Sequence, residues 1–173
     1  APGISVKLSA LHPRYEFAKR ETVVPFLTQR LKSLALQAKE NNISLTVDAE
    51  EADRLDISLD IICAVFCDSD LGDWEGFGLA VQSYQKRASF VIDWLIDLSK
   101  KQGKRWMVRL IKGAYWDTEI KNAQIRGLKG YPVFTRKAST DVCFVACAKK
   151  LLAHTKEIYP QFATHNAYTL ATI

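Results

Sequence analysis

The apolar residues of the chain fall into short extended runs that alternate with longer stretches of helical spacing. The extended runs predict strands at residues 4–11, 43–51, 76–83, 105–112 and 162–166, and a further short extended segment at 132–137. Apolar residues three and four apart predict helices at residues 23–42, 52–66, 88–100, 116–126 and 139–157, and residues 167–173 begin a further element. This succession of strand and helix predicts a parallel sheet with helical crossovers.

Two helices allow a finer prediction. An apolar face on the helix at 88–100 is formed by Phe90, Val91, Trp94, Leu95 and Leu98. We expect this face to be buried. Ser139 or Thr140 is the expected cap of the last long helix.

Two parallel architectures are compatible with this order, an open doubly wound sheet and a (β/α)8 barrel. No G-x-G-x-x-G follows a strand, so the dinucleotide-binding form of the open sheet has no support. The barrel is favoured because polar residues follow or end the predicted strands: Lys7, Asp48, Gln82, Arg109, Lys112, Thr164 and His165. A complete barrel takes roughly 250 residues and eight strands. The 173 residues therefore predict a partial barrel of about five β/α units, in one partial domain.

Charges inside two predicted strands need an explanation. Lys7 interrupts the first strand, and Arg109 and Lys112 interrupt the fourth, just before Gly113. A strand interior normally rejects charge, so these cations need a partner or a ligand. Arg109 and Lys112 either face an anionic or electron-rich ligand, where Gly113 admits a close neighbour, or the arginine belongs to a buried ion pair. Lys7 is either an edge charge or a functional one. Asp48 has two interpretations, a cap of the helix at 52–66 or the partner of a charged group at the strand end.

Composition narrows the class of protein. The net charge is +5, but Lys and Arg are scattered among acids, which does not favour nucleic-acid binding. No apolar run approaches the roughly 18 residues of a membrane span, and the N-terminal residues lack the pattern of a signal peptide. Four cysteines form two helical i, i+4 pairs, Cys63 with Cys67 and Cys143 with Cys147. We interpret them as core thiols rather than a four-thiolate zinc site, and we expect a reducing, cytoplasmic compartment.

The residues at the strand ends limit the chemistry. No Ser-His-Asp or Cys-His nucleophile set can be named, and the three histidines, which are far apart in sequence, predict no metal site. One remaining class is Schiff-base chemistry through Lys7 or Lys112, as in barrel lyases and aldolases. The other is a bound cofactor that carries out the chemistry while the protein positions and polarises it.

Five segments taken together resemble the proline dehydrogenase family, and more narrowly the catalytic domain of its bifunctional bacterial members. They are residues 5–15, 47–52, 79–84, 108–116 and 163–166, and they cover nearly the whole chain in the family's order. The resemblance implies a distorted (β/α)8 TIM-like barrel that holds FAD non-covalently. It also implies oxidation of L-proline to 1-pyrroline-5-carboxylate, with hydride transfer to the flavin N5.

The resemblance assigns the substrate side and the redox end of the cofactor to a few residues. Lys7 would bind the proline carboxylate, Asp48 would balance the local cations and hold the substrate side, and Tyr115 would pack on the proline ring. Gln82 and Arg109 would hydrogen-bond the isoalloxazine, and Arg109 would stabilise the negative charge that develops there.

The remaining cofactor contacts follow from the same resemblance. Lys112, Gly113 and Ala114 would run along the FAD linker, and Trp116 would lie against the adenine. Ala49 also belongs to the cofactor-binding set. The residues expected at the pyrophosphate and ribose are Thr135, Lys137, Thr164 and His165.

The chain also departs from the family. Relative to it, the first strand is missing, as is everything after the sixth, including a helix with an arginine pair for the proline carboxylate and a tyrosine that covers the substrate. We therefore expect most of a flavin site, half of a substrate site, and no activity from this segment alone. For the parent protein the resemblance implies a quinone or membrane electron acceptor and peripheral inner-membrane association. DNA contact would come only through a module outside this chain, and an oligomer remains open.

Overall fold

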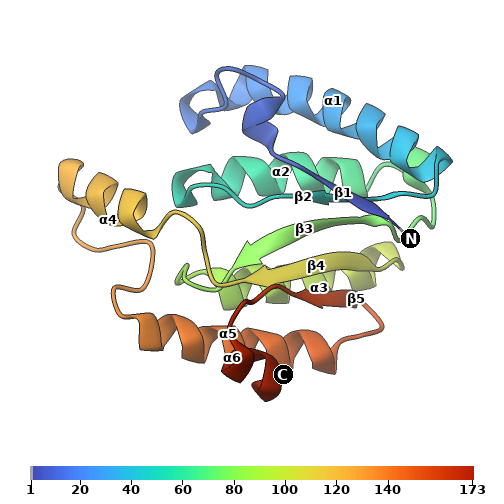
Figure 1. The fold of residues 1–173 in the computed structure, drawn as a ribbon. Coiled ribbons are helices and arrows are strands. Elements are labelled where there is room, and N and C mark those ends of the chain that lie inside the picture. Colours follow the sequence, from blue (N-terminus) through green and yellow to red (C-terminus); the bar gives the residue numbers. More distant parts are fainter. Residues whose placement is uncertain (1) are drawn as a thin grey trace. The chain divides into compact units, whose positions relative to one another are not determined.

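The predicted succession of strands and helices is present in the computed structural model, which describes residues 2–173 (Figure 1). The strands β1 (Gly3–Val6), β2 (Ser44–Val47), β3 (Phe77–Gln82), β4 (Trp106–Ile111) and β5 (Ile158–Phe162) form one sheet in that order. The pairs β1–β2, β2–β3 and β4–β5 are parallel. The structure therefore confirms the predicted α/β class with successive β/α units. The chain divides into two compact units, one ending at Leu79 and the other beginning at Ala80.

The first unit packs two amphipathic helices with the first strands. Helix α1 (Arg20–Glu40) contacts α2 (Leu55–Phe66) and β2. Their buried side chains recur at helical spacing: Val23, Leu27 and Leu31 on α1, and Ile57, Ile61 and Val65 on α2. Single 3-10 turns, η1 to η4, occupy Leu8–Ala10, Phe17–Lys19, Ala52–Arg54 and Ser69–Leu71. Burial of these regularly spaced apolar side chains is the main stabilising term of the unit.

In the second unit, α5 (Lys137–Ala153) packs against α3 (Ala88–Gln102) and against β4 and β5. Alternation along β4 buries Trp106, Val108 and Leu110 completely, whereas Arg109 on the opposite face is half-buried. Two shorter helices complete the unit, α4 (Trp116–Ile125) and α6 (Ala167–Thr172). The strand thus directs Trp106, Val108 and Leu110 to one face, and Arg109 lies on the other face between Met107 and Ile111.

Three predicted strands have the wrong limits, and one of them is β2, which ends at Val47 and not at residue 51. The first ends at Val6, not at residue 11, because the chain turns at Leu8–Ala10 and buries Leu8 there. The last strand is β5, residues 158–162, whereas the prediction placed it at 162–166. Pro160 within β5 argued against a strand, since proline lacks the N–H that a ladder requires. Pro160 nevertheless lies in register with Val108 of the parallel strand β4.

Two other predictions also need correction. The extended segment predicted at residues 132–137 is not one of them, and within it Val133 makes an isolated bridge with Gln85. Helix α5 begins at Lys137, and neither Ser139 nor Thr140 caps it, because Arg136 occupies the cap position without a side-chain bond. On α3 the predicted apolar face is rotated: Phe90 is 73% exposed and Trp94 is 39% exposed, and the buried residues are Val91, Ile92, Leu95 and Ile96.

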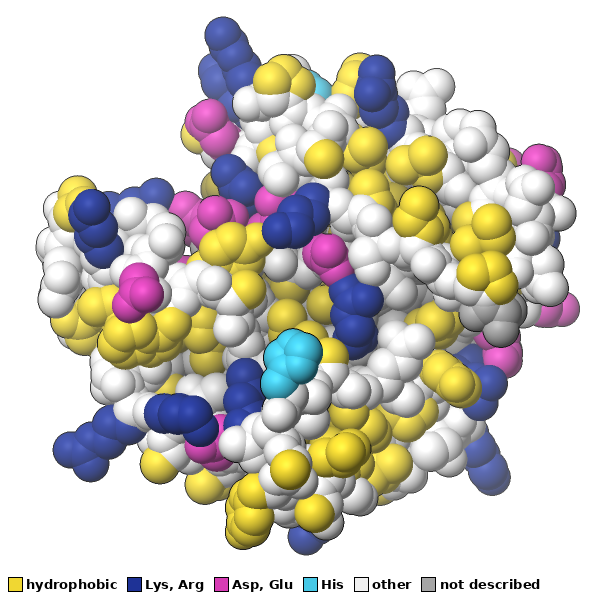
Figure 2. Space-filling model, viewed as in Figure 1, with side chains coloured by type: hydrophobic (Ala, Val, Ile, Leu, Met, Phe, Trp, Pro, Cys, Tyr) yellow, Lys and Arg dark blue, Asp and Glu magenta, His cyan; other side chains and the backbone are white. Residues whose placement is uncertain are grey.

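Figure 2 shows basic side chains dispersed over the visible face of the molecule, with acidic and apolar side chains between them. This matches the scattered charges of the sequence. Within residues 2–173, none of the helices has both the length and the apolar character needed to cross a bilayer.

Candidate functional site

In the first unit the predicted site residues follow the ends of β1 and β2. Val6 pairs with Val47, and the Asp48 N–H donates to the Val6 carbonyl at 2.8 Å. Lys7 and Asp48 are therefore the next residues at the carboxyl end of two neighbouring parallel strands. Lys7 lies beyond the strand rather than inside it and is exposed, whereas Asp48 and Ala49 are half-buried.

The capping interpretation of Asp48 is wrong. Glu51 occupies the cap position of η3, Arg54 precedes α2, and neither helix start has a side-chain cap bond. The nearby carboxylate that organises this region is Glu50, which the sequence did not single out. It accepts from the Ser9 N–H at 3.1 Å and from Arg54 at 3.1 Å, and so ties the segment after β1 to the segment after β2.

In the second unit the site is built around the turn that follows β4. The Ser83 N–H donates to the Ile111 carbonyl and the Tyr84 N–H to the Lys112 carbonyl, both at 2.8 Å. These bonds continue the ladder past the ends of β3 and β4. Lys112 consequently lies one residue beyond β4, not within it as predicted, and the chain turns immediately after it.

Gly113 has φ 147°, and its environment explains why glycine is required. A Cβ at this position would lie far too close to the Tyr84 ring, which is almost fully buried. The close neighbour that the sequence predicted for Gly113 is therefore, within this unit, an aromatic ring of the same chain. The packing of Tyr84 against the backbone fixes the path of the turn.

Two further contacts hold the residues after Gly113. The Ala114 N–H donates to Oε1 of Gln82 at 3.1 Å, and Gln82 is only 2% exposed. The Trp116 Nε1–H donates to the Phe134 carbonyl at 2.9 Å, and the Phe134 N–H donates to the Tyr84 carbonyl at 2.8 Å. The turn from Lys112 to Trp116 is thus bound on one side to the end of β3 and on the other to the loop before α5.

One carboxylate links two of the predicted cofactor-binding lysines. The Lys112 ammonium contacts Asp141 Oδ1 at 2.6 Å, and the Lys137 ammonium contacts Asp141 Oδ2 at 2.7 Å. Lys112 also donates to the Thr169 hydroxyl at 3.1 Å. Hydrogen bonds from the two lysines hold the pKa of Asp141 below its usual range, so this carboxyl is ionised at neutral pH. Sequence reasoning missed Asp141, although its i, i+4 spacing from Lys137 was a usable signal.

A cleft of about 490 Å³ opens beside this ion pair. Its lining residues come from the turn after β4, the start of α5 and the loop before α6: Ile111, Lys112, Gly113, Ala114, Lys137, Ala163, Thr164, His165 and Asn166. The loop is held by its own hydrogen bonds, from the Asn166 N–H to the Thr164 hydroxyl at 3.0 Å and from the Thr169 N–H to Asn166 Oδ1 at 2.9 Å. Six residues predicted to bind the cofactor therefore meet at one cleft.

The whole chain, residues 1–173, matches the family model described as Proline dehydrogenase. The chain belongs to the proline dehydrogenase family. The match includes the residues of the turn after β4 and those that line the cleft, and it extends over both compact units.

Relatives of this proline dehydrogenase chain are much longer proteins. It is 59% identical over 172 residues to the Bifunctional protein PutA of Klebsiella aerogenes, covering 99% of this chain and 13% of that protein. A crystal structure of a Bradyrhizobium japonicum Proline Utilization A mutant matches with a TM-score of 0.97 at 62% identity, over 99% of this chain and 18% of the other. Proline utilization A from Bdellovibrio bacteriovorus, inactivated by N-propargylglycine, matches with a TM-score of 0.93 at 32% identity, over 97% and 17%.

Other predicted residues of this proline dehydrogenase chain do not line the cleft. Arg109 is half-buried on β4, Tyr115 is half-buried, and Trp116 and Thr135 are exposed. One cysteine pair joins Cys63 on α2 to Cys67, the residue after that helix, and the other lies on α5, with Sγ atoms 3.9 Å apart in each pair. Among residues 2–173 no group of three or more His, Cys, Asp or Glu side chains is arranged to hold a metal ion.

Replacement of Gly113 should test the packing of the turn. We expect Gly113→Ala to lower the free energy of unfolding by about 2–5 kcal/mol, because the new Cβ requires a strained φ and meets the Tyr84 ring. The matched control is Gly130→Ala, since a Cβ at Gly130 has no neighbour within 4 Å. Urea unfolding followed by tryptophan fluorescence measures both variants. Equal midpoints would contradict the role given to Tyr84.

Proposed function

We propose that this chain supplies the FAD-binding part of a proline dehydrogenase that oxidises L-proline to 1-pyrroline-5-carboxylate in the full-length protein. The observation that carries the proposal is the cleft beside Lys112 and Lys137, two cations joined by one carboxylate, on a chain that matches the family along its whole length. The relatives named PutA are described as bifunctional, and this chain spans 13% of the one from Klebsiella aerogenes. The activity is therefore proposed for the longer protein.

The donors around the cleft suit the phosphate and ribose portions of FAD. Ammonium, hydroxyl and imidazole groups are the partners that a pyrophosphate and a ribose need, and charge-assisted bonds to phosphate are among the strongest in proteins. We assign this role to Lys112, Lys137, Thr164 and His165, which line the cleft, together with the backbone of Gly113 and Ala114. Thr135 and Trp116 are proposed as further contacts on the basis of the resemblance, as is Ala49.

When bound, FAD would supply the hydride acceptor for the oxidation of proline. Arg109 is proposed to stabilise negative charge at the redox end, because a guanidinium held on a strand needs little reorganisation. Gln82 is proposed to hydrogen-bond the same end of the cofactor, with its orientation set by the Ala114 N–H. For proline itself we propose Lys7 as the carboxylate partner, with Asp48 and Tyr115 as the other contacts.

No observation supports the alternative of a lysine-dependent lyase. Schiff-base chemistry requires a neutral amine. The Lys112 ammonium instead contacts the Asp141 carboxylate at 2.6 Å, which is the arrangement of a charge partner. The electron acceptor, which we predict to be a quinone or another membrane carrier, rests on the resemblance alone.

The absorption spectrum of the full-length protein tests cofactor and substrate together. We expect a flavin band that bleaches when L-proline is added under anaerobic conditions. We also expect loss of this bleaching after treatment with N-propargylglycine, the compound that inactivated the Bdellovibrio bacteriovorus protein. A protein without a flavin band, or a band that proline does not bleach, would contradict the proposed function.

Arg109→Met should impair flavin reduction more than proline binding. Loss of one group that stabilises developing charge typically costs on the order of 100-fold in rate. Stopped-flow measurement of anaerobic reduction at varied proline concentration separates the rate from the binding constant. Arg105→Met is the control, because Arg105 precedes β4 and its guanidinium lies over the Tyr159 ring. Unchanged reduction by Arg109→Met would remove Arg109 from this role.

Lys112→Met should weaken FAD binding by roughly 10- to 100-fold, the effect of losing one hydrogen bond from a charged donor. Fluorescence titration of the apoprotein with FAD measures the change. The control is Lys150→Met on α5. Lys150 is buried to a similar degree, with 26% of its side chain exposed against 24% for Lys112, and it pairs with Asp93 at 2.7 Å. If both variants bound FAD as tightly as the native protein, the phosphate role of Lys112 would be wrong.

A further inference from the structure

The two cysteine pairs have the same spacing but different surroundings. Cys63 lies on α2 and Cys67 is the residue directly after that helix, whereas Cys143 and Cys147 both lie on α5. The Sγ atoms are 3.9 Å apart in each pair. All four are free thiols. Because the distance between the two sulfur atoms is the same in both pairs, we look for a difference in thiol reactivity in the neighbouring groups and in the access of a reagent to each sulfur.

In the first pair, Cys63 is held in the protonated form. Burial, then the neighbouring Cys67 and the Asp60 carboxylate, raise the pKa of Cys63 to about 11. A thiol reacts with electrophiles through its thiolate. Cys63 therefore has little of the reactive form at neutral pH. Cys63 is therefore the reference with which the reactivity of Cys143 is compared.

On α5 the pKa of the first cysteine, Cys143, is shifted in the opposite direction to that of Cys63. The hydrogen bond with Cys147 lowers the pKa of Cys143 to about 7, against the effect of burial, and the Lys150 ammonium adds to the lowering. The charged groups that face this pair are Lys150 on α5 and Asp93 on α3, which are themselves paired. Cys147 is fully buried and its pKa is raised, so it stays a thiol and supports Cys143 as a donor.

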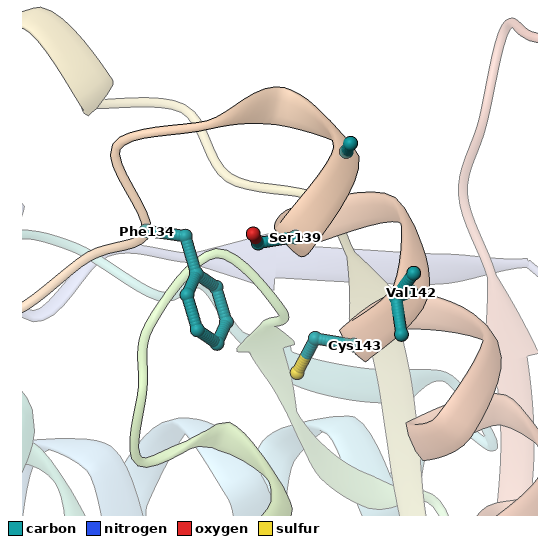
Figure 3. Close-up of a pocket in the computed structure, with 5 residues that line it drawn as sticks. Phe134, Ser139, Val142 and Cys143 are labelled. Carbon is teal, nitrogen blue, oxygen red and sulfur yellow. The ribbon is translucent and has the colours of Figure 1, made fainter.

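Cys143 also faces an apolar recess of about 380 Å³, lined by Phe134, Ala138, Ser139, Val142 and Cys143 itself. In Figure 3 the Cys143 sulfur points to the side on which the Phe134 ring lies. Apart from the Ser139 hydroxyl, the side chains of the recess are hydrocarbon or sulfur. A recess of this size and character suits the body of a small ring-sized apolar molecule.

We propose that Cys143 is a modification site for α,β-unsaturated carbonyl compounds with an apolar body, which the recess beside it holds. The Cys143 thiol gives its proton to solvent, and the sulfur forms a bond to the β-carbon of the electrophile. The electrons of the carbon–carbon double bond move to the carbonyl as an enolate, which takes a proton from water. The product is a thioether, and no external oxidant or reductant is needed.

The experiment treats the folded full-length protein with N-phenylmaleimide at neutral pH, and mass spectrometry of its peptides follows each cysteine. A thiol with a pKa near 7 is about half ionised at neutral pH, whereas a thiol with a pKa near 11 has almost no thiolate there. We expect Cys143 to react at least tenfold faster than Cys63.

A second maleimide separates the effect of the recess on the reaction rate from the effect of the thiol pKa. A maleimide with a charged substituent should lose rate at Cys143 relative to N-phenylmaleimide, while the two should react alike at Cys67. The variant Val142→Asp places a carboxylate at the recess on a residue that is 71% exposed, so it should remove the preference for the phenyl compound without unfolding the protein. Cys63 reacting as fast as Cys143, or Cys143 reacting only after denaturation, would overturn the proposal.

Discussion

The cleft of the second unit depends on how two positively charged side chains, Lys112 and Lys137, are held close together. Lys112 and Lys137 come from different elements, and their repulsion is offset by one carboxylate that contacts both. Asp141 can do this because it lies in the first turns of α5, four residues after Lys137. Lys112 is further restrained by the Thr169 hydroxyl and by the buried Phe144 ring, whose centre is 5.9 Å from its ammonium. An ammonium has three N–H donors, so these contacts leave Lys112 able to bond an additional anion.

In the same unit, hydrogen bonds hold the turn after β4 in one position. The turn after β4 is bound by backbone bonds from Ser83 and Tyr84, by the Gln82 side chain and by the indole bond of Trp116. These contacts come from two separate segments of sequence, the end of β3 and the loop before α5. Rigid placement before ligand binding reduces the entropy that binding must offset. A turn fixed in this way is suited to a ligand with several polar groups in a defined order.

The sequence predicted what is local and missed what depends on distant partners. The order of strands and helices could be predicted because periodicity is a property of consecutive residues. The limits of β5 could not, since a proline argues against a strand and the pairing of Pro160 with Val108 depends on a distant segment of the chain. The strand-end residues were visible as charges after apolar runs. Asp141, the partner of Lys112, and Glu50, which accepts from the Ser9 N–H, were not, because Asp141 is 29 residues from Lys112 and Glu50 is 41 residues from Ser9.

The contact between Tyr84 and Gly113 bears on how this family changes over time. Because the Tyr84 ring occupies the space that a Cβ at position 113 would need, the two positions are not free to vary independently. A side chain at position 113 becomes acceptable only in a lineage that has first lost the bulky ring at position 84, and even then the backbone must leave its present φ. The order of substitutions is thus constrained, and the glycine is retained by its neighbour as much as by any ligand.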